Sequence, residues 1–160
     1  MSGTAVQAGM PACEGPGYQA LDIAQGTVFA ADLAPLGQVC FAARKVSVAE
    51  FSETDYLQFE LLKDGKTVAT LARPERYLWS GGCRVMAVSF PRLTHGPQRS
   101  IVVLGRCNTA QNELMQPLVY RGNGRDFVLD TAVSVEATGL NSIAKVVAKA
   151  RRSGGPGQGR

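Results

Sequence analysis

The chain is predicted to fold as a mainly β protein of the α+β class, an antiparallel sheet of successive hairpins with one C-terminal helix. Short runs of β-branched and aromatic residues recur along the sequence, and Asp64-Gly65 and Asn123-Gly124 offer hairpin turns between such runs. Only near the C-terminus does the apolar period change to that of a helix. A small sandwich or a barrel would bury the apolar faces of such a sheet.

The length of 160 residues fits one domain. Residues 1–17, rich in Gly, Ala and Pro, are predicted to form an irregular arm held by Cys13. Residues 18–152 would form a single β-rich domain closed by a helix at about 139–152, and residues 153–160 a flexible tail. No apolar signal segment precedes Cys13, so we expect a mature exported chain in which Met1 was supplied for expression.

The first strands are predicted in "TVFAADL" and "GQVCFAARKVSVAEF", which flank the turn "APLG". The clearest hairpin is "DYLQFELLKDGKTVATLA", in which Asp64-Gly65 separates two apolar runs. Pairing Lys63 with Lys66 predicts one apolar face. On that face the cross-strand neighbours would be Leu61 with Val68, Phe59 with Thr70, and Leu57 with Ala72.

The second half begins with the loop "RPERYLWSGGC", which carries the only tryptophan, Trp79. We favour core packing for Trp79 and keep a ligand platform as the alternative. The strands "CRVMAVSF" and "SIVVLGRC" follow, and then "QPLVYRGNGRDFVLD", a last hairpin turning at Asn123-Gly124. In the closing helix, Thr138 is the predicted N-cap. One helix face would hold Leu140, Ile143, Ala144 and Val147, and the other Asn141, Lys145, Lys149 and Arg152.

The four cysteines include no close C-x-x-C pair, so the usual zinc-ribbon and thioredoxin-like spacings are absent. Disulfide bonds are the favoured interpretation, and they would place the protein in an oxidising compartment, the periplasm or the extracellular space. The competing interpretation is a cytosolic protein with buried free thiols. No run is long enough to cross a membrane, so no membrane insertion is expected.

The segment "VMAVSFPRLTHGPQRSIVVLGRC" resembles a β-hairpin of the FG-GAP/VCBS type, and "VYRGNGRDFVLD" is similar to the next hairpin in such proteins. The resemblance covers about a third of the chain. In that family the loop reads Asp-Leu-Asn-Gly-Asp-Gly-x-x-Asp and binds calcium. Leu93 keeps its type, whereas other residues replace the family's Asp, Asn, Asp and Asp. The replacements are Arg92, Thr94, Gly96 and Ser100.

The resemblance therefore implies a calcium hairpin that has lost its ligands. Calcium takes six to eight oxygen ligands, usually including carboxylates. The 91–99 loop has no carboxylate and adds Arg92 and Arg99, which repel a divalent cation. We expect no metal and no cofactor.

A disulfide would close this hairpin in place of an ion. Pairing Phe90 with Ser100 places Cys83 opposite Cys107, and Cys13 is then left to pair with Cys40. The same register predicts three apolar pairs: Val88 with Val102, Met86 with Leu104, and Ala87 with Val103.

Basic residues give two candidate binding patches. The register sets Arg84 opposite Arg106, which is unfavourable unless an anion or a carboxylate lies between them, although two guanidinium groups splayed into water remain the alternative. Arg92, His95 and Arg99 could extend this positive surface at the hairpin tip.

The net charge of +4 owes much to cations near the C-terminus, which we interpret as a solvated helix end and tail. No aromatic residues alternate with them, so no nucleic-acid partner is expected.

Enzymatic activity is not predicted. His95 is the only histidine, and no local motif joins it to Ser89, Ser100 or Asp126 as a triad. Glu60, Asp126 and Asp130 are available carboxylates, but nothing in the sequence brings two of them to one cleft.

The predicted function is a small exported binding protein, with an inhibitor or a toxin-immunity protein that docks a protein partner as its most concrete form. A structural or accessory component of a bacterial envelope assembly and a glycan-binding module are the alternatives.

Overall fold

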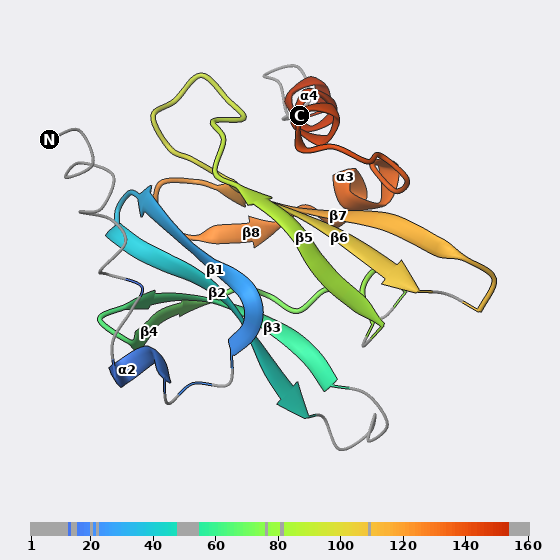
Figure 1. Ribbon diagram of the computed structural model, residues 1–160. Helices are drawn as coiled ribbons and strands as arrows, with labels where there is room; N and C mark the ends of the chain where they lie inside the picture. The colour runs from blue at the N-terminus through green and yellow to red at the C-terminus, as the bar shows by residue number, and fades with distance from the viewer. Residues whose placement is uncertain are drawn as a thin grey trace, which may run out of the picture. The chain divides into compact units, whose positions relative to one another are not determined.

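The computed structural model describes residues 13, 16–19, 21, 23–47, 55–75, 77–80, 82–108 and 110–153. The described elements form two antiparallel sheets of four strands each, β1-β2-β3-β4 and β5-β6-β7-β8 (Figure 1). The prediction of a mainly β protein is confirmed, and neither sheet closes into a barrel. Most of the predicted arm 1–17 and nearly all of the tail 153–160 lie outside the described residues.

The chain divides into two compact units, Met1–Arg73 and Pro74–Arg160. The first contains α2 (Pro16–Gln19), β1 (Ile23–Leu33), β2 (Gly37–Ser47), β3 (Asp55–Lys63) and β4 (Lys66–Thr70). The second contains β5 (Cys83–Ser89), β6 (Ile101–Asn108), β7 (Glu113–Gly122), β8 (Phe127–Leu129), α3 (Thr131–Glu136) and α4 (Ile143–Ser153). The boundary coincides with the predicted loop "RPERYLWSGGC". That the two units make a single domain stays a prediction.

The hairpin of β3 and β4 turns as predicted. Asp64 and Gly65 have φ values of 53° and 78°, the left-handed conformation that a two-residue hairpin turn requires, and Lys63 lies opposite Lys66. The next pair, Leu62 with Thr67, also keeps the predicted register, but beyond it the predicted register is wrong by one residue. A β-bulge shifts the ladder so that Leu61 faces Ala69, and Val68 is left as the extra residue, 42% exposed.

The hairpin of β5 and β6 shows the same kind of error. Cys83 lies opposite Cys107 and Arg84 opposite Arg106, as predicted. A bulge at Met86 then shifts the ladder by one residue, so the three predicted apolar pairs are wrong and Met86 is 43% exposed. Beyond the bulge, Val88 faces Val103.

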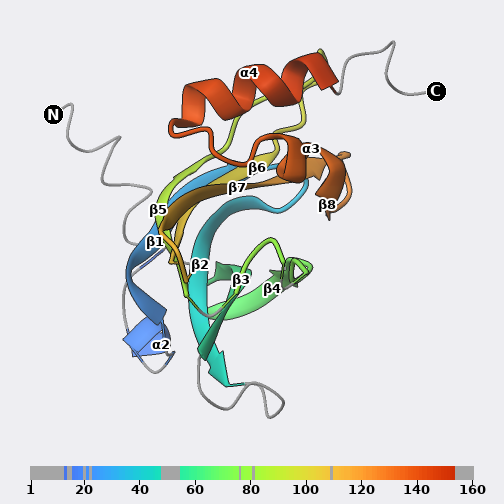
Figure 2. The same cartoon turned by 90° about the vertical axis from the view of Figure 1, so that its right-hand side faces the viewer.

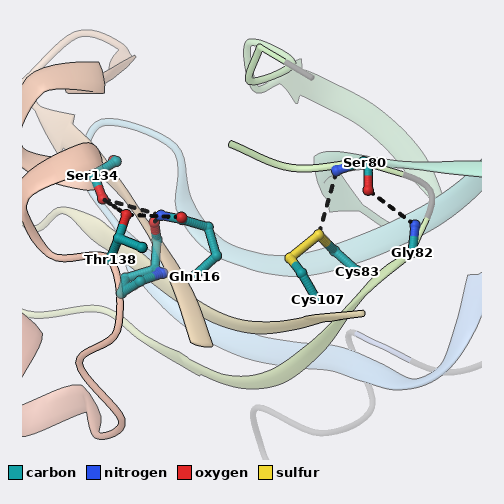
Figure 3. The surroundings of a disulfide bond; sticks show 8 residues. Ser80, Gly82, Cys83, Cys107, Gln116, Ser134 and Thr138 are labelled. Carbon is teal, nitrogen blue, oxygen red and sulfur yellow. Dashed lines mark hydrogen bonds between the residues drawn. A yellow bond between two sulfur atoms is a disulfide. The ribbon is translucent and has the colours of Figure 1, made fainter. Parts of the chain in front are cut away.

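Both predicted disulfides are present, Cys13–Cys40 in the first unit and Cys83–Cys107 in the second. Figure 3 shows Cys83–Cys107, in which the Cys83 sulfur also accepts a hydrogen bond from the Ser80 N–H at 3.3 Å. Because disulfides persist in oxidising surroundings, the two bonds indicate a compartment outside the cytoplasm. Among the described residues, no helix has the length and hydropathy of a membrane-spanning segment.

The first unit buries a carboxylate. Glu60 on β3 is 2% exposed, and it accepts hydrogen bonds from Gln58 Nε2 (2.6 Å), Thr67 Oγ1 (2.9 Å) and Arg44 Nη1 (3.2 Å). Burial is the largest single influence on the pKa of Glu60 and raises it, but these hydrogen bonds and the Arg44 charge together hold the pKa below its ordinary value. This cluster ties β2, β3 and β4 together.

The second unit packs its helices on one sheet (Figure 2), with α4 crossing β5 and β6 and α3 lying against β7. Their common core is formed by apolar side chains of the loop, the strands and both helices. The fully or nearly buried members are Leu93, Val102, Leu104, Val119, Val133, Ala137, Val146 and Ala150.

The C-terminal helix differs from the predicted one in its start and in its buried face. It begins at Ile143, where the Ser142 hydroxyl accepts a hydrogen bond from the Lys145 N–H (3.2 Å), so the N-cap is Ser142 and the predicted N-cap Thr138 is wrong. Val146 and Ala150 are its buried residues. The predicted apolar face packs against the core through Leu140, Ile143 and Val147, whereas its fourth member, Ala144, is exposed.

The short helix α3 was not predicted, and it covers the edge of β7 beyond the end of β8. The Asp130 N–H donates to the Val119 carbonyl (2.8 Å), the Val119 N–H donates to the Ser134 hydroxyl (3.0 Å), and the Gly139 N–H donates to the Met115 carbonyl (2.9 Å). Three backbone groups of this edge, on Val119 and Met115, are thereby paired without another strand.

Proline and glutamine complete the same edge. Pro117 has no N–H to satisfy, and its carbonyl accepts from Gln116 Nε2 (2.8 Å). Gln116 is buried, and its Nε2 also donates to the Ser134 carbonyl (3.1 Å) while its Oε1 accepts from the Thr138 hydroxyl (2.9 Å), as Figure 3 shows. Thr138 therefore fixes α3 to β7 instead of capping α4.

Candidate functional site

The 91–99 loop, the predicted recognition site, is closed at its base by backbone and arginine contacts. The Ser100 N–H donates to the Pro91 carbonyl (2.7 Å), and Arg99 Nη1 donates to the Phe90 carbonyl (2.9 Å). Leu93 is 4% exposed and enters the core beneath α4. The base of the loop is therefore fixed by contacts of the chain itself.

At the loop tip, the predicted residues have different positions. Arg92 and His95 are exposed, whereas Arg99 is half-buried and serves the loop base. Gln98 Nε2 donates to the Thr94 hydroxyl (3.3 Å), and Arg92 Nε donates to the Pro97 carbonyl (3.4 Å). The loop thus presents Arg92 and His95 on a short framework of internal hydrogen bonds.

The loop and the C-terminal end of α4 meet, which the sequence did not indicate. Arg151 Nε and Nη2 both donate to the Arg92 carbonyl, at 3.1 and 3.0 Å, across 59 residues of sequence. Arg151 is itself exposed. We call the exposed residues Arg92, His95 and Arg151 the loop–helix surface. It joins two basic segments that had been considered separately.

The second predicted patch has a carboxylate partner. Arg84 is exposed and lies opposite Arg106, and Arg106 Nη1 lies 3.6 Å from Glu113 Oε1. The side chains of Arg106 and Glu113 are 36% and 54% exposed, so this pair contributes little stability but offsets part of the repulsion between the two arginines. The patch is less positive than the sequence predicted.

Trp79 is 1% exposed and belongs to the core. Its ring packs over Gly105 on β6, where the Cβ of any larger residue would overlap the indole. This position agrees with core packing and leaves no indole surface open to a ligand.

A groove between α3 and α4 was not predicted. It has a volume of about 330 Å³ and is lined by Glu136, Leu140, Lys145, Ala148, Lys149 and Arg152. The three cations are those predicted for the solvated face of the helix. Their helical spacing was visible in the sequence, but the opposing wall comes from the helix that was missed.

Ser100 and the three carboxylates considered for catalysis have other hydrogen-bond partners. The Ser100 hydroxyl accepts from the Gly122 N–H (3.0 Å), and Asp126 Oδ1 accepts from Asn123 Nδ2 (2.7 Å) in the β7–β8 turn. Asp130 Oδ2 accepts from Arg121 Nε (2.6 Å), and Glu60 has its own partners in the first unit. Within the described part of the chain, no hydrogen bond joins His95 to Ser89, Ser100 or Asp126.

The residues that the structure describes contain no cluster of three or more His, Cys, Asp or Glu side chains placed to hold a metal ion. That the 91–99 loop binds no calcium stays a prediction. Calorimetric titration with millimolar calcium would check it.

Comparison of the chain with protein-family models, with curated proteins and with solved structures finds no match. The resemblance of the 85–107 hairpin to FG-GAP/VCBS proteins therefore stays a prediction without support from a relative.

Proposed function

We propose that the protein is an exported binding protein without enzymatic activity that docks a protein partner through the loop–helix surface. The observation that carries the proposal is the pair of hydrogen bonds from Arg151 to the Arg92 carbonyl. They tie an exposed basic loop to a basic helix end, and the loop is fixed below by Leu93 in the core. A rigid support for an exposed loop is the usual arrangement of recognition surfaces.

The chemistry of the surface favours an acidic partner. Arginine is enriched at interface hot spots and binds carboxylates through paired N–H donors. Arg151 uses two guanidinium nitrogens for the Arg92 carbonyl, whereas Arg92 uses only Nε for the Pro97 carbonyl. We therefore assign the contact with the partner to the side chains of Arg92 and His95, which are exposed. The most concrete version of this function is an inhibitor or an immunity protein, which acts by covering a surface of its partner protein.

The test replaces Arg92 and His95 together with alanine. The backbone carbonyl of Arg92 is retained, so the contact from Arg151 should survive. The variant loses the hydrogen bond from Arg92 Nε to the Pro97 carbonyl (3.4 Å), but the contacts at the loop base remain. A partner captured from host extract is identified by mass spectrometry, purified and titrated against each variant. We expect the affinity to fall about tenfold or more, which corresponds to about 1.4 kcal/mol.

Arg125→Ala is the matched control, because Arg125 is an exposed arginine of the same unit in the β7–β8 turn. It should leave both the affinity and the melting curve unchanged. Equal binding by the wild type and the double variant would rule out the loop–helix surface as the docking site.

A further inference from the structure

The groove between α3 and α4 is lined by both apolar and basic side chains. Leu140 and Ala148 are the apolar residues, and Lys145, Lys149 and Arg152 of α4 are the cations. The volume of about 330 Å³ lies at the small end of ligand pockets, which range over roughly 300–1,000 Å³. The space suits one or two side chains.

The spacing along α4 explains why these cations share one flank. Positions 145, 149 and 152 follow one another at four and three residues, so they lie on one face of the helix, while Val146 and Ala150 are buried on another. Lys145 and Lys149 repel each other at this spacing, which disfavours the isolated helix. A bound anion would relieve that repulsion.

One carboxylate already lies at the groove. Glu136 Oε1 at the end of α3 lies 3.6 Å from Lys149 Nζ, and their side chains are 54% and 32% exposed. Lys145 Nζ donates to Asn141 Oδ1 (3.3 Å), a neutral partner. Three cations therefore face a single carboxylate, and the groove keeps a net positive charge.

We infer that this groove binds an acidic segment of a protein partner, with one apolar side chain over Leu140 and Ala148 and its neighbouring carboxylates on Lys145, Lys149 and Arg152. The inference rests on the proposed function, because it extends docking from the loop–helix surface to the opposite flank of α4. Arg151 and Arg152 are adjacent in sequence, so one partner can contact both flanks.

An anionic membrane suits the groove less well than a protein segment. Helices that lie on membranes insert large apolar side chains, and the large apolar side chains that are exposed in the described part of the chain include none from α4. A concave site receives a protruding side chain, which a partner protein can supply.

The probe is a fluorescein-labelled peptide of repeated Asp-Asp-Leu units, and its affinity is measured by fluorescence anisotropy. The groove variant carries Lys145→Gln, Lys149→Gln and Arg152→Gln. We expect it to bind the peptide about tenfold or more weakly than the wild type. Glu136→Gln should instead strengthen binding about two- to threefold, because it removes the carboxylate that competes for Lys149. An Asp-Asp-Ser peptide should bind more weakly than the Asp-Asp-Leu peptide.

The control variant carries Lys45→Gln, Lys66→Gln and Arg125→Gln, which remove the same charge at exposed positions outside the groove. It should change the affinity by less than about twofold. Equal losses in the groove and control variants, or equal affinity for the leucine and serine peptides, would overturn the inference. The inference would also be overturned if the wild type bound phosphatidylglycerol vesicles but not the peptide, and if the groove variant lost this binding to vesicles.

The two proposals fail separately. If replacement of Arg92 and His95 abolishes binding of the purified partner and the groove variant binds it normally, the proposed function stands and the groove inference falls. If only the groove variant loses the partner, docking does not use the loop–helix surface. Circular dichroism of each variant shows whether the fold is intact.

Discussion

Arg121 on β7 connects both helices of the second unit, and its replacement should loosen them together. Its Nε donates to Asp130 Oδ2 at 2.6 Å, and its Nη2 donates to the Ala150 carbonyl at 2.9 Å. Asp130 is the N-cap of α3, where its Oδ1 accepts from the Val133 N–H (3.0 Å). Ala150 belongs to the last turn of α4, whose carbonyls have no partner within the helix. One guanidinium thus fixes the start of α3 and the end of α4.

The expected loss of stability in the Arg121→Met variant follows from the burial and charge of the contacts that Arg121 makes. A hydrogen bond to a charged group contributes about 1.5–3 kcal/mol, and the Arg121 and Asp130 side chains, each 22% exposed, are intermediate between surface and buried pairs. The charge near the C-terminus of α4 adds about 0.3–1 kcal/mol. Arg121 Nη1 is buried without a hydrogen-bond partner among the described residues, which lowers the net value. We expect Arg121→Met to lower the free energy of unfolding by about 2–4 kcal/mol.

Urea unfolding of the full chain measures this loss. Trp79 is the only tryptophan and lies in the same unit, so its fluorescence reports unfolding there, and circular dichroism follows the whole chain. Asp130→Asn removes the charge but keeps an oxygen that can cap α3. A double-mutant cycle of Arg121→Met with Asp130→Asn should give a coupling energy of about 1–2 kcal/mol.

Arg125→Met is the control for loss of an arginine, and it should change the stability by less than about 0.5 kcal/mol. The reasoning is refuted if the coupling energy is below about 0.3 kcal/mol, or if Arg125→Met is as damaging as Arg121→Met. A folded Arg121→Met variant should also bind the acidic peptide more weakly, because the two walls of the groove lose their common anchor.

Three further results are expected. Replacing Cys83 and Cys107 with serine opens a bridge with a sequence separation of 24 and should cost about 3 kcal/mol in urea unfolding; an unchanged midpoint would contradict this. Gly105→Ala should cost at least about 1–3 kcal/mol, because its Cβ overlaps the Trp79 ring, and should change the Trp79 emission; wild-type stability and emission would place the ring elsewhere. The folded-state pKa of Glu60 lies below its ordinary value of 4.5. Its ionised form therefore stabilises the protein above pH 4.5, and this stabilisation is lost as the pH falls through the folded-state pKa. The stability difference between wild type and Glu60→Gln should therefore shrink below pH 4.5, and a constant difference would show that the carboxylate charge contributes nothing.

Turns and the pairs next to them could be predicted from the sequence, because their signals are local. The turn at Asp64 and Gly65 depends only on residues that accept a positive φ. The bulges at Val68 and Met86 could not be predicted, since each turns an apolar side chain outward against the alternation of its strand. Their positions depend on packing across the sheet.

The same distinction explains the helices. The long amphipathic run of α4 has a helical period of its own, so the sequence indicated it. The segment of α3, "TAVSVE", is short and rich in β-branched residues, which favour strands. It is helical because Asp130 caps it and Ser134 and Gly139 bind the edge of β7. These contacts arise only when the unit is folded.

The candidate site also has a part that the sequence could predict and a part that it could not. The basic loop and the basic helix end were each visible as charge patterns. The contact of Arg151 with Arg92, across 59 residues, and the wall that Glu136 adds to the groove come from tertiary packing. Sequence patterns could identify the charged side chains but not which of them share a surface.

The disulfide connectivity also bears on how the protein is made. Each bridge joins cysteines that are consecutive in the sequence and lie in one unit, Cys13 with Cys40 and Cys83 with Cys107. When a chain is exported from its N-terminus, an oxidase that joins cysteines in their order of arrival produces both native bridges directly. If the protein is exported as proposed, its maturation should need a thiol oxidase but no disulfide isomerase, and its yield in an isomerase-deficient host should equal that in the parent strain.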